Sequence, residues 1–164
     1  MPDLLVALYK LPPIESTLES LRGQGINIRR GNPWEITPTR AFIEKHFATT
    51  WADEVSVGFA NKPVTVFLAT EQGQIVGFAA YECTRRGYFG PTGVAESMRG
   101  RGIGAVLLLA SLHGLREMGY AYGIIGGAGP VEFYKRACGA IEIPDSTPGI
   151  YVDLLKRAAP PAAK

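Results

Sequence analysis

One stretch of the sequence, residues 94–105, combines glycines and arginines in a pattern that suits anion binding. It reads Val94-Ala95-Glu96-Ser97-Met98-Arg99-Gly100-Arg101-Gly102-Ile103-Gly104-Ala105 and leads from an apolar run into a long apolar helix. Glycines permit a tight turn there and leave backbone N–H groups open at a helix N-terminus, where unpaired donors and the helix dipole attract a phosphate. The stretch therefore predicts a phosphate site, to which Arg99 and Arg101 can add positive charge.

Two common phosphate-binding loops do not fit this stretch. A dinucleotide-binding GxGxxG motif needs a third glycine where the sequence has Leu107, and an acidic residue about 20 positions further on, which is absent. A Walker loop ends in Gly-Lys followed by Ser or Thr, and the sequence has no such ending here. Both nucleotide-binding loops are therefore excluded.

The order of the strands and helices expected around this turn predicts a layered α+β domain. Apolar and β-branched runs predict strands at residues 4–9, 26–29, 64–69, 75–83, 88–94 and 120–125, and a last pair at 141–143 and 150–154. Helical patterns begin at Ser16 and cover residues 38–47, 52–60, about 102–118 and 130–138. An antiparallel meander followed by a strand–helix–strand crossover predicts α/β/α layers. We expect a mixed, mostly antiparallel sheet of six to seven strands with helices on both faces.

Length and composition limit the remaining classes of protein. The chain has 164 residues, of which 46% are hydrophobic and 20% charged, and a net charge of +2. This excludes a disordered chain and disfavours a nucleic-acid binder, because the basic residues are scattered. We expect one domain over residues 1–157, with an N-terminal extension at 1–24 and a flexible tail at 158–164.

Neither a membrane segment nor a metal site is predicted. The apolar runs at residues 4–9 and 103–112 are too short for a signal-peptide core and a membrane span, respectively. The protein is therefore expected to be soluble and cytoplasmic, with no membrane partner. Cys83 and Cys138 form no CxxC pair and are interpreted as reduced core thiols, while His46 and His113 are interpreted as structural.

The turn, taken together with its neighbours, resembles a known family. Residues 99–104 match the pattern (Gln/Arg)-x-x-Gly-x-(Gly/Ala) of the GCN5-related N-acetyltransferase family, and residues 133–140 resemble its Phe-Tyr element. The resemblance extends from about Ile26 to Leu155. It implies the acyl-CoA N-acyltransferase fold, acetyl-CoA as co-substrate, and a pantetheine arm lying between two splayed strands like an added strand.

The same resemblance assigns the cofactor-binding residues by position. It places the pantetheine and acetyl group at Gly93, Val94 and Ala95, and the pyrophosphate at the turn that follows. The full set that it implies is Gly93, Val94, Ala95, Arg99, Gly100, Arg101, Gly102, Ile103, Gly104, Ala105 and Tyr134.

Acetyl transfer to an amine requires a stabilised oxyanion, a protonated leaving thiolate and a neutral amine. The resemblance gives the first role to the backbone N–H of Val94 and the second to Tyr134. Tyr134 also shares a helical stripe with Val131 and Cys138, so a core role stays open. The strand before the turn lacks the family's usual glutamate, and we expect Glu82 on the neighbouring strand to serve as the base, directly or through water.

The acceptor site is expected where one helix connection, one strand and the last hairpin meet. The residues proposed for it are Thr49, Thr50, Trp51, Tyr81, Glu82, Asp145 and Tyr151. The implied function is an N-acetyltransferase that moves acetyl from acetyl-CoA to the primary amine of a small molecule, an amino sugar or an amino-acid-like metabolite. Direct attack in a ternary complex is the expected mechanism. A protein lysine or N-terminal acetyltransferase and a non-catalytic acyl-CoA sensor remain alternatives, and the sequence leaves a homodimer open.

Overall fold

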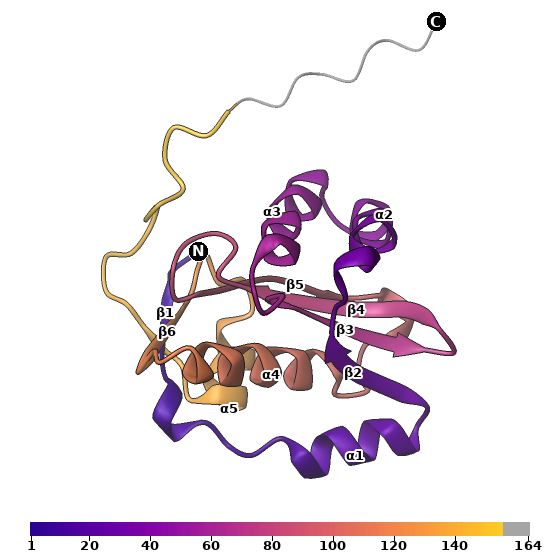
Figure 1. The fold of residues 1–164 in the computed structure, drawn as a ribbon. Coiled ribbons are helices and arrows are strands. Elements are labelled where there is room, and N and C mark those ends of the chain that lie inside the picture. The colour runs from indigo at the N-terminus through magenta and orange to yellow at the C-terminus, as the bar shows by residue number, and fades with distance from the viewer. Residues whose placement is uncertain (156–164) are drawn as a thin grey trace, which may run out of the picture.

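A mixed sheet organises the part of the chain that the computed structural model describes, residues 1–155 (Figure 1). Its seven strands lie in the order β2-β3-β4-β5-β6-β1-β7, and every neighbouring pair is antiparallel except β5 and β6. The strands are β1 (Leu4–Ala7), β2 (Ile26–Arg30), β3 (Val66–Glu71), β4 (Gln74–Tyr81), β5 (Tyr88–Val94), β6 (Tyr122–Ile125) and β7 (Ile141–Glu142). The predicted fold class is confirmed.

Helices cover both faces of the sheet, as predicted (Figure 1). The α-helices are α1 (Glu15–Gly23), α2 (Ile36–His46), α3 (Thr49–Ala60), α4 (Ile103–Glu117) and α5 (Val131–Cys138), with short 3-10 turns at Leu8–Lys10, Pro33–Glu35 and Glu96–Met98. Figure 1 shows α2 and α3 on one face and α1, α4 and α5 on the other. The apolar helix α4 supplies much of the main core, including Leu107 and Leu112, which are fully buried. No helix of residues 1–155 has the length and hydropathy needed to span a membrane.

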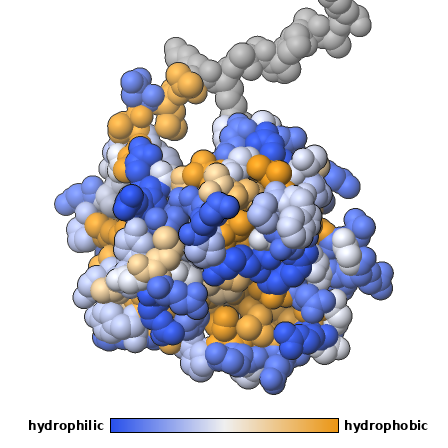
Figure 2. All heavy atoms as spheres, in the orientation of Figure 1, coloured by the Kyte–Doolittle hydropathy of each residue, from blue (hydrophilic) through white to orange (hydrophobic). Residues whose placement is uncertain are grey.

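The N-terminal strand lies inside the sheet, so the segment 1–24 that we expect to be an extension contributes a strand to the domain. β1 lies between β6 and β7, and its Leu4 and Val6 are fully buried. The predicted last strand at 150–154 does not form. Val152 and Leu154 are exposed, and Figure 2 shows apolar side chains where the chain leaves the domain. The strand at residue 141 pairs with β1 instead. The predicted tail at 158–164 lies outside the described residues.

Asp3, just before β1, fastens the N-terminus to two loops. Its carboxylate Oδ1 accepts a hydrogen bond from the Gly127 N–H at 2.7 Å, and its own N–H donates to Ser146 Oγ at 2.9 Å. Only 6% of Asp3 is exposed. Asp3 therefore holds the connection between β6 and α5, where the cavities described below lie.

A bidentate ion pair joins β2 to the start of α2. The Arg29 guanidinium contacts both oxygens of Glu35 at 2.6 and 2.7 Å, and the Asn32 N–H also donates to Glu35 at 2.7 Å. These bonds lower the pKa of the Glu35 carboxyl from 4.5 to about 2, with the Arg29 hydrogen bond as the largest cause. The ionised carboxylate therefore stabilises the folded chain.

Glu35→Gln is expected to lower the free energy of unfolding at neutral pH by about 1 kcal/mol, because the pair is partly exposed to solvent. The Glu35 carboxyl has the lower pKa in the folded state, so its stabilisation is complete above the unfolded pKa. It is lost as the pH falls through the folded value of about 2. Urea unfolding of parent and variant at about pH 7 and about pH 2.5 measures this window. A difference that stays constant between these pH values would contradict the electrostatic assignment.

Candidate functional site

The two central parallel strands separate part-way along their length. β5 and β6 are paired only at Tyr88–Ile124 and Phe89–Ile125, whereas β5 continues to Val94. A cavity of about 920 Å³ opens beyond this pairing, between β5, the turn into α4, and the β6–α5 connection. Its lining includes Phe47, Trp51, Phe89, Thr92, Gly93, Val94, Met98, Arg99, Gly100, Gly102, Ile103, Gly104, Ala105, Gly126–Pro130, Phe133 and Tyr134.

The N-terminus of α4 borders this cavity. Gly100 and Gly102 have φ values of +80° and +82°, a left-handed conformation that favours glycine, and Gly102 is the N-cap of α4. The first N–H groups of a helix have no intrahelical partner, and Ile103, Gly104 and Ala105 all line the cavity. The geometry suits an anion, as the sequence pattern predicts.

The two arginines of the turn have different surroundings. Arg99 lines the cavity and donates from Nε to the Val94 carbonyl at 3.3 Å. Arg101 instead forms an ion pair with Glu71 at 3.1 Å and does not line the cavity. The predicted cofactor role of Arg101 stays a prediction, and its guanidinium is paired here with a carboxylate on β3.

The backbone of Val94 faces the space between the strands. The Ala95 N–H donates to the Val76 carbonyl on β4 at 2.9 Å. Because backbone groups alternate along an antiparallel strand, the N–H and carbonyl of Val94 point away from β4. Val94 can therefore donate a hydrogen bond into the cavity, whereas the N–H of Ala95 is already used in the sheet. Ala95 does not line the cavity, and its predicted cofactor contact stays a prediction.

Gly93 allows an aromatic ring to approach β5 closely. A Cβ at Gly93 would collide with the ring of Phe47, which packs against β5 from the loop between α2 and α3. The glycine therefore has a packing role as well as its place in the cavity wall.

Tyr134 lies in the first half of α5 and lines the cavity. Tyr134 is 7% exposed. Its ring packs edge-to-face against the rings of Phe89 and Phe133, whose centroids are 6.3 and 5.1 Å away, respectively. Among residues 1–155 no group is hydrogen-bonded to its hydroxyl. Burial is the main cause that raises the pKa of Tyr134, to about 12. The hydroxyl therefore remains protonated, and the residue both packs in the core and borders the cavity.

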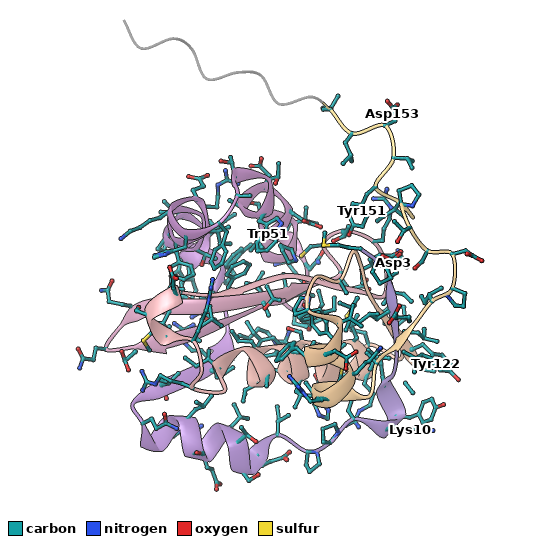
Figure 3. All side chains as sticks on the ribbon, turned by 180° about the vertical axis from the view of Figure 1, so that it is seen from behind. Asp3, Lys10, Trp51, Tyr122, Tyr151 and Asp153 are labelled. Carbon is teal, nitrogen blue, oxygen red and sulfur yellow. The ribbon has the colours of Figure 1, made fainter. Side chains whose placement is uncertain are left out.

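A smaller cavity of about 330 Å³ adjoins the first. The two share Met1, Trp51, Phe89, Gly90, Pro91, Gly126 and Gly127. The smaller one is completed by Glu54, Thr84, Thr147, Pro148 and Tyr151. Figure 3 shows Trp51 on α3 and Tyr151 on the C-terminal segment at the same edge of the domain. Trp51 and Tyr151 thus line one cavity.

Five of the seven residues predicted for the acceptor site line neither cavity. Tyr81 is fully buried, packs against Gly114 of α4, and accepts a hydrogen bond from Arg30. Glu82 accepts hydrogen bonds from the Gly87 N–H and the Tyr120 hydroxyl and lines neither cavity. Its carboxylate closes the turn between β4 and β5, so the structure brings the predicted base to neither cavity.

Asp145 lies in an exposed loop with a φ of +55°. It borders a separate surface hollow with Pro2, Glu142 and Ser146. Neither Thr49 nor Thr50 lines the two cavities.

Glu54 was not predicted as a site residue. Its position three residues after Trp51 places both side chains on one face of α3, which is a signal that the sequence contains. Cys83 is unsuited to nucleophilic chemistry, since burial raises the pKa of its thiol to about 12. Residues 1–155 contain no group of three or more His, Cys, Asp or Glu side chains able to hold a metal ion.

Comparisons with known proteins agree with this geometry. The sequence model of the acetyltransferase (GNAT) family matches residues 28–140, well over half of the chain. No curated protein sequence matches. Two similar solved structures are the GCN5-related glucosamine N-acetyltransferase region of a fungal multi-domain GH3 β-N-acetylglucosaminidase (17% identity, TM-score 0.70) and a GCN5-related N-acetyltransferase from Sphaerobacter thermophilus (24% identity, TM-score 0.66).

Each of these two likenesses covers 87% of this chain but only 19% and 48%, respectively, of the other protein, so the chain spans less than half of their length. A GNAT family acetyltransferase from Brucella melitensis, solved in complex with acetyl-CoA, is 25% identical with a TM-score of 0.52. That match covers 68% of this chain and 80% of the other.

Proposed function

Because the chain belongs to the acetyltransferase (GNAT) family, we propose that it transfers the acetyl group of acetyl-CoA to the primary amine of a small molecule. The observation that carries the proposal is the cavity between the splayed strands β5 and β6, which connects the N-terminus of α4 to the backbone of Val94. Amino sugars and amino-acid-like metabolites both carry such an amine, and both belong in the test.

The cavity fits the parts of acetyl-CoA in order. The pyrophosphate of acetyl-CoA would accept hydrogen bonds from the backbone N–H groups of residues 103–105, and Arg99 would add positive charge. The pantetheine arm would lie along β5 and pair with backbone groups near Val94, as an added strand does. The acetyl group would then lie near the junction with the smaller cavity. The acetyl-CoA bound by the Brucella melitensis protein supports this choice of co-substrate.

The proposed reaction is a direct attack. The neutral amine nitrogen bonds to the acetyl carbonyl carbon, and the Val94 N–H stabilises the negative charge that develops on the carbonyl oxygen. The C–S bond then breaks with its electron pair on sulfur. The nitrogen loses one proton and sulfur gains one, so the products are the N-acetyl amine and free CoA.

Tyr134 would assist the departure of sulfur as a hydrogen-bond donor. The pKa of its hydroxyl is about 12, whereas a thiol has a pKa of about 8.5. Full transfer of the tyrosine proton to the thiolate is therefore unfavourable. A hydrogen bond from Tyr134 still stabilises the charge on sulfur, and the amine nitrogen is the stronger source of the transferred proton.

The test is thiol release from acetyl-CoA across a panel of amines, amino sugars and peptides, with mass spectrometry of each product. We expect amine-dependent thiol release and a product that is heavier by one acetyl group. Acetylation of peptides alone would favour a protein acetyltransferase. CoA binding without turnover of any amine would favour a sensor and contradict the proposal.

A further inference from the structure

Glu54 is the one carboxylate that lines the smaller cavity in the described part of the chain. It lies on α3 and is partly buried. The Thr84 hydroxyl, from the loop between β4 and β5, donates a hydrogen bond to its Oε1. That bond holds the carboxylate in place and leaves Oε2 without a hydrogen-bond partner among residues 1–155. Glu54 can therefore accept a hydrogen bond from a molecule in the cavity.

The charge around the smaller cavity is negative. No Lys, Arg or His side chain of residues 1–155 lines it. Arg85 directly follows the lining residue Thr84 in the sequence. Its side chain is exposed and donates a hydrogen bond to the Thr84 carbonyl. Burial and then the negative charges of Glu54 and Asp3 raise the pKa of Tyr151, and they outweigh the positive charge of Arg85, which lowers it. A cation is therefore favoured beside Glu54. The positive group among the described residues that line this cavity is the N-terminal amino group of Met1, which is 74% exposed to solvent and therefore screened.

The remaining walls are mostly uncharged. Trp51, Phe89, Pro91 and Tyr151 provide aromatic or apolar surface, which suits a neutral molecular body. The cavity also shares the 89–91 segment of β5 with the proposed cofactor cavity, so a group beside Glu54 lies near the strand that leads to Val94.

We propose that Glu54 receives the ammonium group of the acceptor, which releases one proton to solvent before the neutral amine attacks, and that the acceptor is a primary amine with no anionic group. The inference rests on the proposed acetyltransferase function and narrows its substrate class, because it excludes free amino acids and sugar phosphates. Trp51 and Tyr151 would contact the neutral body of the molecule.

The first experiment replaces Glu54 by Gln, which keeps the size of the side chain and its ability to accept from Thr84. With the best amine of the panel, Glu54→Gln is expected to raise KM roughly tenfold or more, while the Kd for CoA changes less than about twofold. Asp53→Asn is the matched control. Asp53 precedes Glu54 on α3, but its side chain is 64% exposed and pairs with Arg40. A KM that is unchanged in Glu54→Gln, or raised equally in Asp53→Asn, would overturn the assignment.

The second experiment tests the substrate class with two matched pairs, phenethylamine against phenylalanine and glucosamine against glucosamine 6-phosphate. Within each pair the members differ by one anionic group. The neutral-bodied member is expected to have a kcat/KM roughly tenfold higher or more. A preference for the anionic member would contradict this inference but leave the proposed function intact. Failure of the parent protein to acetylate any amine would instead contradict the proposed function.

Discussion

Tyr134→Phe is expected to lower kcat by a factor of about 10 to 10³ while CoA affinity and melting temperature remain close to the parent values. The substitution removes only the hydroxyl and keeps the ring that packs against Phe89 and Phe133. Since no other group among residues 1–155 is hydrogen-bonded to that hydroxyl, its removal leaves no protein partner unsatisfied. The loss should therefore appear in the chemical step and not in folding.

Steady-state kinetics with acetyl-CoA and the best amine, together with thermal unfolding, measure this effect. Tyr9→Phe is a surface control, because the Tyr9 side chain is exposed and its hydroxyl shares a hydrogen bond with the hydroxyl of Tyr122. A kcat within about twofold of the parent would remove Tyr134 from the mechanism and leave it as a packing residue of α5.

The turn into α4 could be predicted because its signals are local. Gly100 and Gly102 occur where the backbone needs positive φ, and the apolar helix follows at once in the chain. Residues that are close in sequence must also be close in space, so the pattern placed Arg99 and residues 102–105 together. The direction of a single side chain was less predictable, since Arg101 turns to Glu71 on a different strand.

The order of the edge strands could not be predicted from local patterns. The segments at 4–7 and 150–154 are both short and apolar, and nothing within either segment decides which one pairs beside β6. That choice depends on contacts across the whole chain, such as the hydrogen bonds of Asp3 to the Gly127 and Ser146 regions. These contacts join residues more than 120 positions apart.

Glu82 lies outside both cavities for a related reason. The apolar run 75–83 predicts a continuous strand, but β4 ends at Tyr81 and Glu82 has a φ of +59°. This local bend takes the Glu82 carboxylate into the following turn, where the Gly87 N–H binds it. Glu54 escaped prediction because α3 was recognised mainly by its apolar residues, whereas its role depends on the loop that brings Thr84 beside it.

Gly104→Val is expected to weaken CoA binding roughly tenfold or more, which corresponds to about 1.4 kcal/mol. Gly104 lines the cavity in the first turn of α4, where the backbone N–H groups would approach the pyrophosphate. In the free protein a Cβ at this position makes only ordinary contact, 3.7 Å from Val94 Cγ2, so the variant should fold. Gly102→Val would be a poorer test, because a φ of +82° strains any side chain there.

Calorimetric titration with CoA measures the loss, and Gly23→Val is a matched control. Gly23 lies in α1, and a Cβ there would meet no atom within 4 Å. Acetyl-pantetheine, which lacks the nucleotide and its phosphates, separates the pyrophosphate contact from damage to the rest of the cavity. The kcat/KM with acetyl-pantetheine is expected to be lower than that with acetyl-CoA in the parent protein. If the added side chain blocks only the approach of the phosphates, Gly104→Val should lower kcat/KM with acetyl-CoA and leave kcat/KM with acetyl-pantetheine nearly unchanged. Equal losses with both donors would mean that the side chain disturbs the acetyl end, and unchanged CoA affinity would mean that the α4 N-terminus does not hold the pyrophosphate.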